Sequence, residues 1–189
     1  MDGTGWNGSN PVEWNTTSAI KLTADGKTLL GRGGRRDAIG TRSLFLWAQD
    51  KGIVPLPTLM GGGYLSPHMT PDASVVVANE GNSVDGLTPV VWDEQHGMRR
   101  LYDTLVTDHA FAQPEGFMSR VLGISADQMT LLLRSGTSND AQAWILYLDK
   151  PLVTPVPEPA SRMIVLVGAI TIAALRPRWR RARCAVVKA

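Results

Sequence analysis

Three histidines are the side chains of this chain best suited to bind a metal ion or to transfer protons. His68 precedes a predicted turn, His96 lies in a predicted hairpin turn, and His109 lies in a predicted loop between repeat units. No two of them have the spacing of metal ligands, there is no H-E-x-x-H motif, and Cys184 is the only cysteine. We therefore interpret them as solvent-exposed loop histidines, with metal binding as the alternative, and predict no catalytic site.

Two further segments have the composition of ligand-binding loops. Residues 31–36 read GRGGRR after an apolar run, as a phosphate-binding loop would, but they lack the Gly-Lys-Ser/Thr ending and a following helix. Asn79, Asn82 and Asp85 could offer oxygen ligands to calcium, but they match neither the EF-hand pattern nor its distal glutamate. We predict a flexible loop at residues 31–36, and no cofactor, no bound metal and no enzymatic activity.

The charged residues are divided unevenly along the chain. Six of the lysines and arginines lie between Met163 and Ala189, a stretch that contains no acid. The body before Met163 holds all 17 acidic side chains and only thirteen basic ones, so it carries a net negative charge of four. The pI near 8.9 therefore comes from the tail. A mildly acidic body gives no electrostatic reason to expect binding to DNA or RNA.

The C-terminal tail combines a proline turn, an apolar run and a cluster of arginines. The turn consists of Pro157, Glu158 and Pro159. The uncharged apolar run begins at Met163, ends at Leu175, and includes Leu166, Gly168 and Ile172. The arginines that follow are Arg176, Arg178, Arg180, Arg181 and Arg183. Arginines beside an apolar segment are retained on the cytoplasmic side, so this tail should place the body outside the inner membrane.

This order of Pro-Glu-Pro, apolar run and arginine cluster resembles a PEP C-terminal sorting signal, also called an ice-binding-protein C-terminal domain. The resemblance covers residues 156–183. It implies an exported bacterial protein that is held briefly in the inner membrane and cut near Glu158 by an exosortase-type membrane protease. It also implies a final location at the cell surface or outside the cell.

The apolar run is short for a membrane span. As a helix, the run from Met163 to Leu175 rises about 20 Å, against about 30 Å of hydrocarbon. The absence of a polar stripe and the adjacent arginines favour a hydrophobic membrane segment at residues 160–176 and a basic cytoplasmic tail at 177–189. A packed terminal helix and a nucleic-acid-binding tail are the alternatives. Because the N-terminus shows no export signal, we expect an upstream start or a shortened relic of a longer gene.

The body contains three related sequence units. Residues 20–31 read IKLTADGKTLLG, residues 69–78 read MTPDASVVVA, and residues 123–133 read GISADQMTLLL. Later in each unit, an apolar strand ends at a tryptophan or contains one. The repeated positions are Asp25, Asp72 and Asp127 in the turns, and Trp47, Trp92 and Trp144 in the strands. Successive members of each set are separated by about 45–55 positions, a period typical of propellers and other stacked arrays.

These units resemble HAF-type extracellular repeats, whose signature joins an S-A-D-G turn to an A-F-L-W strand. The matching segments are TADG at residues 23–26, SADQ at 125–128, LFLW at 44–47 and AW at 143–144. Pro71 and Ala73 alter the second turn, and Gln128 replaces the glycine of the third, so we expect weakened turns. The resemblance extends over positions 18–152 and implies a bacterial surface protein.

The turns and strands also have a structural interpretation that needs no ligand. An Asp-Gly pair between apolar runs favours a tight hairpin, and the runs at 29–30, 75–77 and 131–133 suit strands buried on both faces. The tryptophans should fill equivalent core positions, with a sugar-stacking platform as the alternative. We predict an all-β, repeat-built, partial β-propeller-like body with a C-terminal hydrophobic helix, and a short turn within residues 99–106.

The predicted organisation is a body of degenerate β repeats at residues 1–152, a proline linker with the sorting motif at 153–159, and the tail. A truncated first unit containing residues 11–14 precedes units at about 18–61, 62–110 and 118–152. We predict an exported, non-enzymatic β-repeat protein of the bacterial envelope or matrix, with the membrane and an exosortase as partners and extracellular polysaccharide as a candidate ligand. The alternatives are a sugar-binding or enzymatic propeller fragment whose site lies in missing blades, and a nonfunctional gene remnant.

Overall fold

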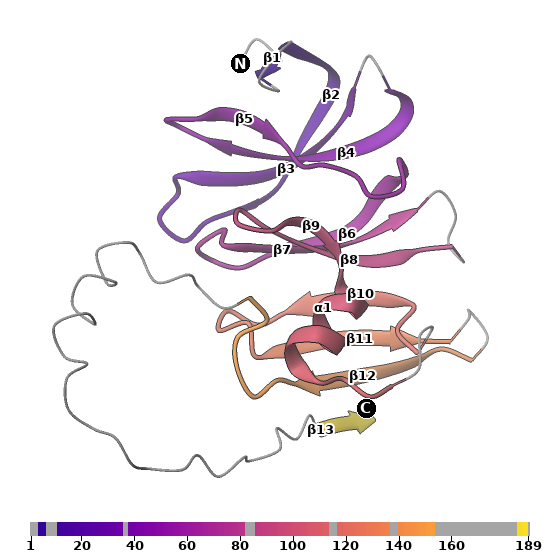
Figure 1. The fold of residues 1–189 in the computed structure, drawn as a ribbon. Coiled ribbons are helices and arrows are strands. Elements are labelled where there is room, and N and C mark those ends of the chain that lie inside the picture. The colour runs from indigo at the N-terminus through magenta and orange to yellow at the C-terminus, as the bar shows by residue number, and fades with distance from the viewer. Residues whose placement is uncertain are drawn as a thin grey trace, which may run out of the picture.

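Antiparallel β-strands make up most of the described structure. The computed structural model describes residues 4–6, 11–35, 38–81, 86–113, 117–136, 140–153 and 185–188. Within these ranges the strands form three antiparallel sheets, and one helix, α1 (Leu101–His109), follows the second sheet (Figure 1). The prediction of an all-β body is confirmed in part, since the described residues are mostly β and also form one short helix.

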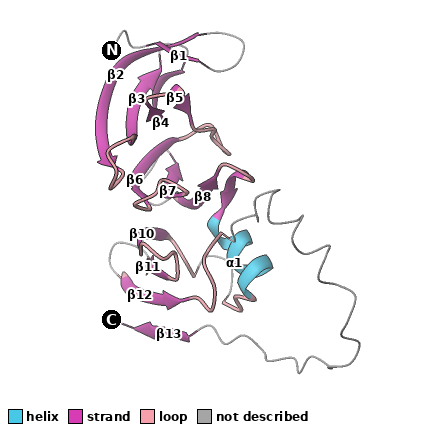
Figure 2. Cartoon of the chain, turned by 90° about the vertical axis from the view of Figure 1, so that its left-hand side faces the viewer, coloured by secondary structure: helices cyan, strands magenta, loops and turns pink. Residues whose placement is uncertain are grey.

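Each sheet is a meander, because its strands are neighbours in the order in which the chain forms them. The first sheet contains β1 (Thr4–Trp6), β2 (Pro11–Leu22), β3 (Thr28–Arg35), β4 (Ala38–Ala48) and β5 (Gly52–Pro55). The second contains β6 (Gly63–Met69), β7 (Val75–Gly81), β8 (Thr88–Asp93) and β9 (Gly97–Arg100). The third contains β10 (Arg120–Ile124), β11 (Thr130–Ser135), β12 (Gln142–Tyr147) and β13 (Ala185–Lys188). The second sheet lies between the first and the third (Figure 2).

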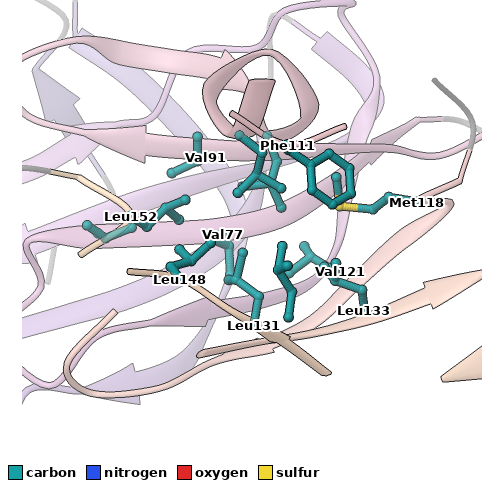
Figure 3. Packing of buried hydrophobic residues seen from close by; sticks show 13 residues of the cluster. Val77, Val91, Phe111, Met118, Val121, Leu131, Leu133, Leu148 and Leu152 are labelled. Carbon is teal, nitrogen blue, oxygen red and sulfur yellow. The ribbon is translucent and has the colours of Figure 1, made fainter. Parts of the chain in front are cut away.

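The second sheet is buried on both faces. Successive side chains of a strand point to opposite faces, and β7 uses both. Val76 and Ala78 join a hydrophobic cluster shared with the first sheet. Val75 and Val77 join a second cluster shared with the third sheet and α1 (Figure 3). This confirms that residues 75–77 form a strand buried on both faces.

In the third sheet, strand β11 is buried on one face only. Leu131 and Leu133 are buried in the cluster shared with the second sheet, whereas Leu132 is 39% exposed. The prediction of a strand buried on both faces is therefore wrong for residues 131–133. Within the described part of the chain, this sheet packs against a neighbouring sheet on one side alone, so alternate side chains reach solvent.

Helix α1 packs on the face of the second sheet that points towards the third. Leu101 and Leu105 are fully buried in the cluster shared with the third sheet. The helix ends at Ala110, which takes a left-handed φ of 51° and whose N–H donates to the carbonyl of Leu105. The sequence predicted only a short turn here, although the four-residue spacing of these leucines is typical of a helix.

Of the two terminal segments singled out in the sequence, one lies outside the described residues and the other lies in the first sheet. The hydrophobic helix expected at residues 160–176 lies outside the described residues, and the described C-terminal residues form the strand β13. Among the described residues, no helix combines the length and the apolar character needed to cross a membrane. Residues 11–14, expected to belong to a separate partial unit, lie in β2, where Trp14 pairs with Arg35 of β3 in the first sheet.

The three Asp-containing turns share one hydrogen-bond pattern. In the second turn, the Thr70 hydroxyl donates to Asp72 Oδ1 at 2.6 Å and accepts the N–H of Val75 at 3.1 Å. The N–H of Ser74 donates to Asp72 Oδ1 at 3.1 Å. The equivalent residues are Thr23, Asp25, Lys27 and Thr28 in the first turn and Ser125, Asp127, Met129 and Thr130 in the third. A hydroxyl and a carboxylate two residues apart thus close each hairpin.

The position after each aspartate is left-handed in all three turns. Gly26, Ala73 and Gln128 have φ values of 73°, 60° and 62°. Glycine adopts this conformation without steric cost, whereas alanine and glutamine are strained in it. The second and third turns, which have alanine and glutamine in place of the glycine, therefore keep the hydrogen bonds of the first turn. The weakening expected for these two turns takes the form of backbone strain.

Exchanging glycine and alanine at this position should move stability in opposite directions. We expect Ala73→Gly to raise the free energy of unfolding, and Gly26→Ala to lower it, by about 1 kcal/mol each. No atom lies within 4 Å of a Cβ built at Gly26, so the second variant reports backbone strain alone. Urea unfolding followed by circular dichroism measures both. A loss of stability in Ala73→Gly would contradict the expectation and indicate that the core contact of the Ala73 methyl outweighs the strain.

Hydrogen bonds also join the three turns to one another. The N–H of Ala24 donates to the carbonyl of Pro71 at 3.1 Å. The side-chain amide of Gln128 donates to Ser74 Oγ at 3.0 Å and accepts the N–H of Val153 at 3.2 Å. Gln128, which departs from the repeat motif, therefore links the second turn to the third and to the segment after β12.

Four aspartates, the three of these turns and Asp93 at the end of β8, have pKa values below the ordinary one. For Asp25 and Asp127, the main cause is the hydrogen bond from the hydroxyl two residues earlier. At Asp72 and Asp93, burial is the largest single effect and raises the pKa, but the hydrogen bonds to each carboxylate together outweigh it and lower the pKa. The folded chain therefore binds protons at these carboxylates less readily than the unfolded chain does.

We expect the body to lose stability in acid. Because the folded pKa values are depressed, this contribution is complete above the ordinary value of 3.8 and falls as the pH drops below it. Urea midpoints between roughly pH 6 and pH 2 measure the loss. Thr70→Val, which removes the hydroxyl donor to Asp72, should lower stability near neutrality and flatten the acid slope. A midpoint independent of pH would contradict this.

Candidate functional site

The sorting residues predicted from the sequence lie outside the described residues. This applies to the motif at 157–159, to the apolar run at 163–175 and to the arginines at 176, 178, 180, 181 and 183. They remain predictions from the sequence. The described body ends at Val153, three residues before the Val156 that opens the motif.

The histidines occupy three different environments. His68 lies in β6, not in a loop, and burial, followed by the charge of Lys21, lowers its pKa. His96 lies in the β8–β9 turn, as predicted, with Nδ1 at 2.8 Å from Asp93 Oδ1. His109 is 2% exposed at the end of α1, where its Nε2 lies 3.2 Å from the carbonyl of Leu152. The interpretation as a solvated loop histidine is therefore wrong for His109.

No metal site is formed by the described residues. Across the described ranges, no three His, Cys, Asp or Glu side chains gather closely enough to hold an ion. Asn79 is 1% exposed, and its amide donates to the carbonyl of Val121 and accepts the N–H of Val121, both at 2.8 Å. The calcium interpretation fails for Asn79, because its amide joins the second sheet to the third. Asn82 and Asp85 lie outside the described residues.

The glycine-rich segment at residues 31–35 forms the second half of β3, so the prediction of a flexible loop is wrong. Gly31 lies opposite Phe45 of β4 in the register. A Cβ at Gly31 would lie 2.2 Å from Phe45 Cζ, so only glycine lets the phenylalanine ring cross the strand. This close approach, and not phosphate binding, accounts for the glycine.

The repeated tryptophans pack on the cores and are half-buried. Trp92 packs against the cluster shared with the first sheet, and Trp144 against the cluster shared with the second. Trp47 packs beside Phe45 on the face of the first sheet that points away from the second. The indole N–H of Trp144 donates to Ser135 Oγ at 2.7 Å. The prediction of positions between sheets is therefore confirmed for Trp92 and Trp144 and is wrong for Trp47, whose cluster contains residues of the first sheet alone.

An open cleft of about 610 Å³ lies between the segment after β5 and helix α1. Its lining combines hydroxyls, carboxylates, guanidinium groups and an apolar lip. The lining residues are Leu59, Met60, Thr88, Arg99, Arg100, Asp103, Thr104, Thr107 and Asp108. Leu59 and Met60 are 44% and 55% exposed, so the lip is open to solvent.

A buried carboxylate holds each wall of the cleft. Glu80, fully buried at the end of β7, accepts the N–H of Leu59 at 2.9 Å and of Met60 at 2.8 Å. On the other wall, Asp93 is 3% exposed and accepts a hydrogen bond from the Arg99 guanidinium. Arg99 Nη1 also lies 3.9 Å from Asp108 Oδ2. The cleft therefore has fixed walls and a guanidinium group held between two carboxylates.

No sequence motif indicates this cleft. The one available signal is the Asn79-Glu80 pair at the end of an otherwise apolar strand, because buried polar side chains need defined partners. The hydroxyls, carboxylates and guanidinium groups that line the cleft can bind a ligand rich in hydrogen-bonding groups. The lining residues include three threonine hydroxyls and two aspartate carboxylates, and they contain no serine, cysteine or histidine.

No family model matches this chain, and no curated protein matches it. Solved structures to which this chain shows a partial likeness include TolB from Acinetobacter baumannii, at 13% identity, with a TM-score of 0.47, over 77% of this chain and 37% of that one. They also include the Myceliophteria thermophila Cps50 (Swd1) beta-propeller domain, at 15% identity, with a TM-score of 0.39, over 78% of this chain and 45% of that one. The chain thus spans less than half the length of either structure.

Proposed function

We propose that this chain is an exported, non-enzymatic β-repeat protein of the bacterial envelope or extracellular matrix, with a partial β-propeller-like body. The observation that carries the proposal is the tail sequence, in which a Pro-Glu-Pro turn precedes an uncharged apolar run and five arginines. Strands β1 to β12 end before Val153, so a cut near Glu158 separates them from the membrane-directed tail and from β13. The charge bias of the arginines retains the tail inside and the body outside.

The processing step is tested in a host that contains an exosortase, with an export signal supplied upstream of the chain. Intact mass of the mature protein should show loss of residues 163–189, and its pI should fall to the acidic side. Replacing Arg178, Arg180, Arg181 and Arg183 with glutamine should leave the precursor uncut. The matched variant with four lysines keeps the charge and should be cut. A mature wild-type protein that retains its basic tail would contradict the proposal.

The cleft is the surface to which we assign contact with polysaccharide. The Thr107 hydroxyl, the Asp103 carboxylate and the Arg100 guanidinium are groups that hydrogen-bond to sugar hydroxyls, and Met60 offers an apolar contact. Binding of the mature body to a polysaccharide panel should weaken in Asp103→Ala/Asp108→Ala and persist in Glu94→Ala, which lies outside the cleft. Absence of binding by the wild type would remove the polysaccharide from the proposal and leave the sorting result unaffected.

A further inference from the structure

The third sheet obtains its last strand from a distant part of the chain. In the first two sheets, the last strand follows its neighbour after a short turn, at residues 49–51 before β5 and 94–96 before β9. In the third sheet, β12 ends at Tyr147 and β13 begins only at Ala185. It pairs antiparallel with β12, with Tyr147 opposite Ala185 and Trp144 opposite Lys188 (Figure 1). The outer edge of β12 is thus covered by the chain's own C-terminal residues.

Without β13, the edge of β12 has none of the usual protections against pairing with another chain. Proteins protect sheet edges with charged residues, prolines, bulges or very short strands. The last strands of the other two sheets have such protections, since β5 is a four-residue strand that ends in Pro55 and β9 contains Arg99 and Arg100. β12 reads QAWILY, contains no charge and no proline, and pairs with β11 in unbroken register.

The cover provided by β13 is also exchangeable. Only four residue pairs hold it, and the whole segment between Val153 and Ala185 must close a loop for the pairing to form. The entropy lost in closing a loop grows with loop length, so pairing between segments this far apart in the sequence costs more than pairing across a short turn. Moreover, residues 185–188 cannot pair with the body outside the membrane while the arginine cluster before them is retained inside.

We propose that the outer edge of β12 is a strand-docking surface, filled by β13 in the uncut chain and by β12 of a second copy once β13 is withdrawn. Two identical edges can pair antiparallel about a two-fold axis, which gives a closed dimer with a continuous sheet. Withdrawal of β13 in the cell, by membrane insertion or by cleavage, rests on the proposed function. The docking surface itself depends on neither.

The experiment withdraws β13 in the full chain, without exosortase or membrane. In an antiparallel strand, adjacent N–H groups point to opposite sides, so Val186→Pro/Val187→Pro removes a bond to β12 whichever residue donates it. Sedimentation in detergent should show a monomer for the wild type and a dimer for the proline variant. Val186→Thr/Val187→Thr, which keeps strand propensity, should remain a monomer. Excess peptide with the sequence of residues 184–189 should return the proline variant to a monomer.

A disulfide tests the pairing directly. In a Cys184→Ser background, Tyr147→Cys/Ala185→Cys places two cysteines at opposed positions, and they should form a bond within one chain. A chain that ends after residue 184 provides a second test and should dimerise like the proline variant. The proposal is overturned if both β13 variants stay monomeric while retaining the wild-type circular dichroism, or if the disulfide does not form. Neither outcome bears on processing by an exosortase, and failed processing leaves both measurements unchanged.

Discussion

Asn79→Ala should lower the free energy of unfolding by about 2–4 kcal/mol, because it removes two hydrogen bonds that join the second sheet to the third. The Asn79 amide is 1% exposed and bonds both the N–H and the carbonyl of Val121 at 2.8 Å. Alanine leaves both backbone groups buried without these partners. Each buried group that loses its hydrogen bond costs about 1–3 kcal/mol. We therefore expect this to be among the most destabilising single changes in the body.

The measurement is urea unfolding together with hydrogen exchange at the Val121 amide. Protection of that amide should fall in Asn79→Ala more than protection of amides in β3 or β4 of the first sheet. Asn79→Asp keeps an acceptor for the Val121 N–H but loses the donor to its carbonyl, so its stability should be intermediate near neutral pH. Leu132→Ala, on the exposed face of β11, is the control and should have a much smaller effect. Equal stability of Asn79→Ala and the wild type would show that the bonded pair contributes nothing.

Glu80→Gln should destabilise the protein by about 2–3 kcal/mol and loosen one wall of the cleft. The two carboxylate oxygens of Glu80 accept the N–H groups of Leu59 and Met60. Glutamine preserves the shape of the side chain but turns an NH₂ group towards one of these donors. Because the carboxylate is fully buried, water cannot replace the lost acceptor.

A second readout comes from Tyr64, which is almost fully buried and donates to the carbonyl of Pro57. Burial, followed by the charge of Glu80, raises the pKa of Tyr64. Removing that charge should lower the pKa, which ultraviolet titration of the tyrosines at high pH measures. Glu94→Gln is the matched control, because Glu94 is exposed and only its surface pair with Lys51 is lost. An unchanged tyrosine titration in Glu80→Gln would contradict the predicted proximity of the charge.

The sequence predicted the features that arise from local chemistry. Each turn needs a hydroxyl, an aspartate two residues later and a left-handed position after it, all within a single short segment. The strands on either side follow from continuous apolar runs such as 75–77. Even Gln128, which breaks the motif, keeps the turn because the hydrogen bonds fix the backbone more strongly than the strain opposes it.

The features that the sequence did not predict depend on partners far along the chain. Asn79 bonds a residue 42 positions later, and His109 contacts one 43 positions later. The glycines at 31–35 resemble a loop until the ring of Phe45 is placed over Gly31. A pattern within one segment cannot show which backbone group will lie beside a polar side chain after the sheets pack. For this reason the sequence alone indicated a solvent-exposed loop for His109 and a possible metal ligand for Asn79, although both side chains are buried.

The placement of the second sheet has a mechanical consequence. It gives one face to the first sheet and the other to the third, and among the described residues no hydrophobic cluster contains both outer sheets. Under tension applied to its ends, the chain therefore has no shared core that would make all three sheets yield at once. An outer sheet can peel away and leave two partners joined, whereas rupture of the central sheet exposes both clusters together. Extension should thus proceed in steps from the outside inwards, so that the body can lengthen under shear and reform while its centre stays folded.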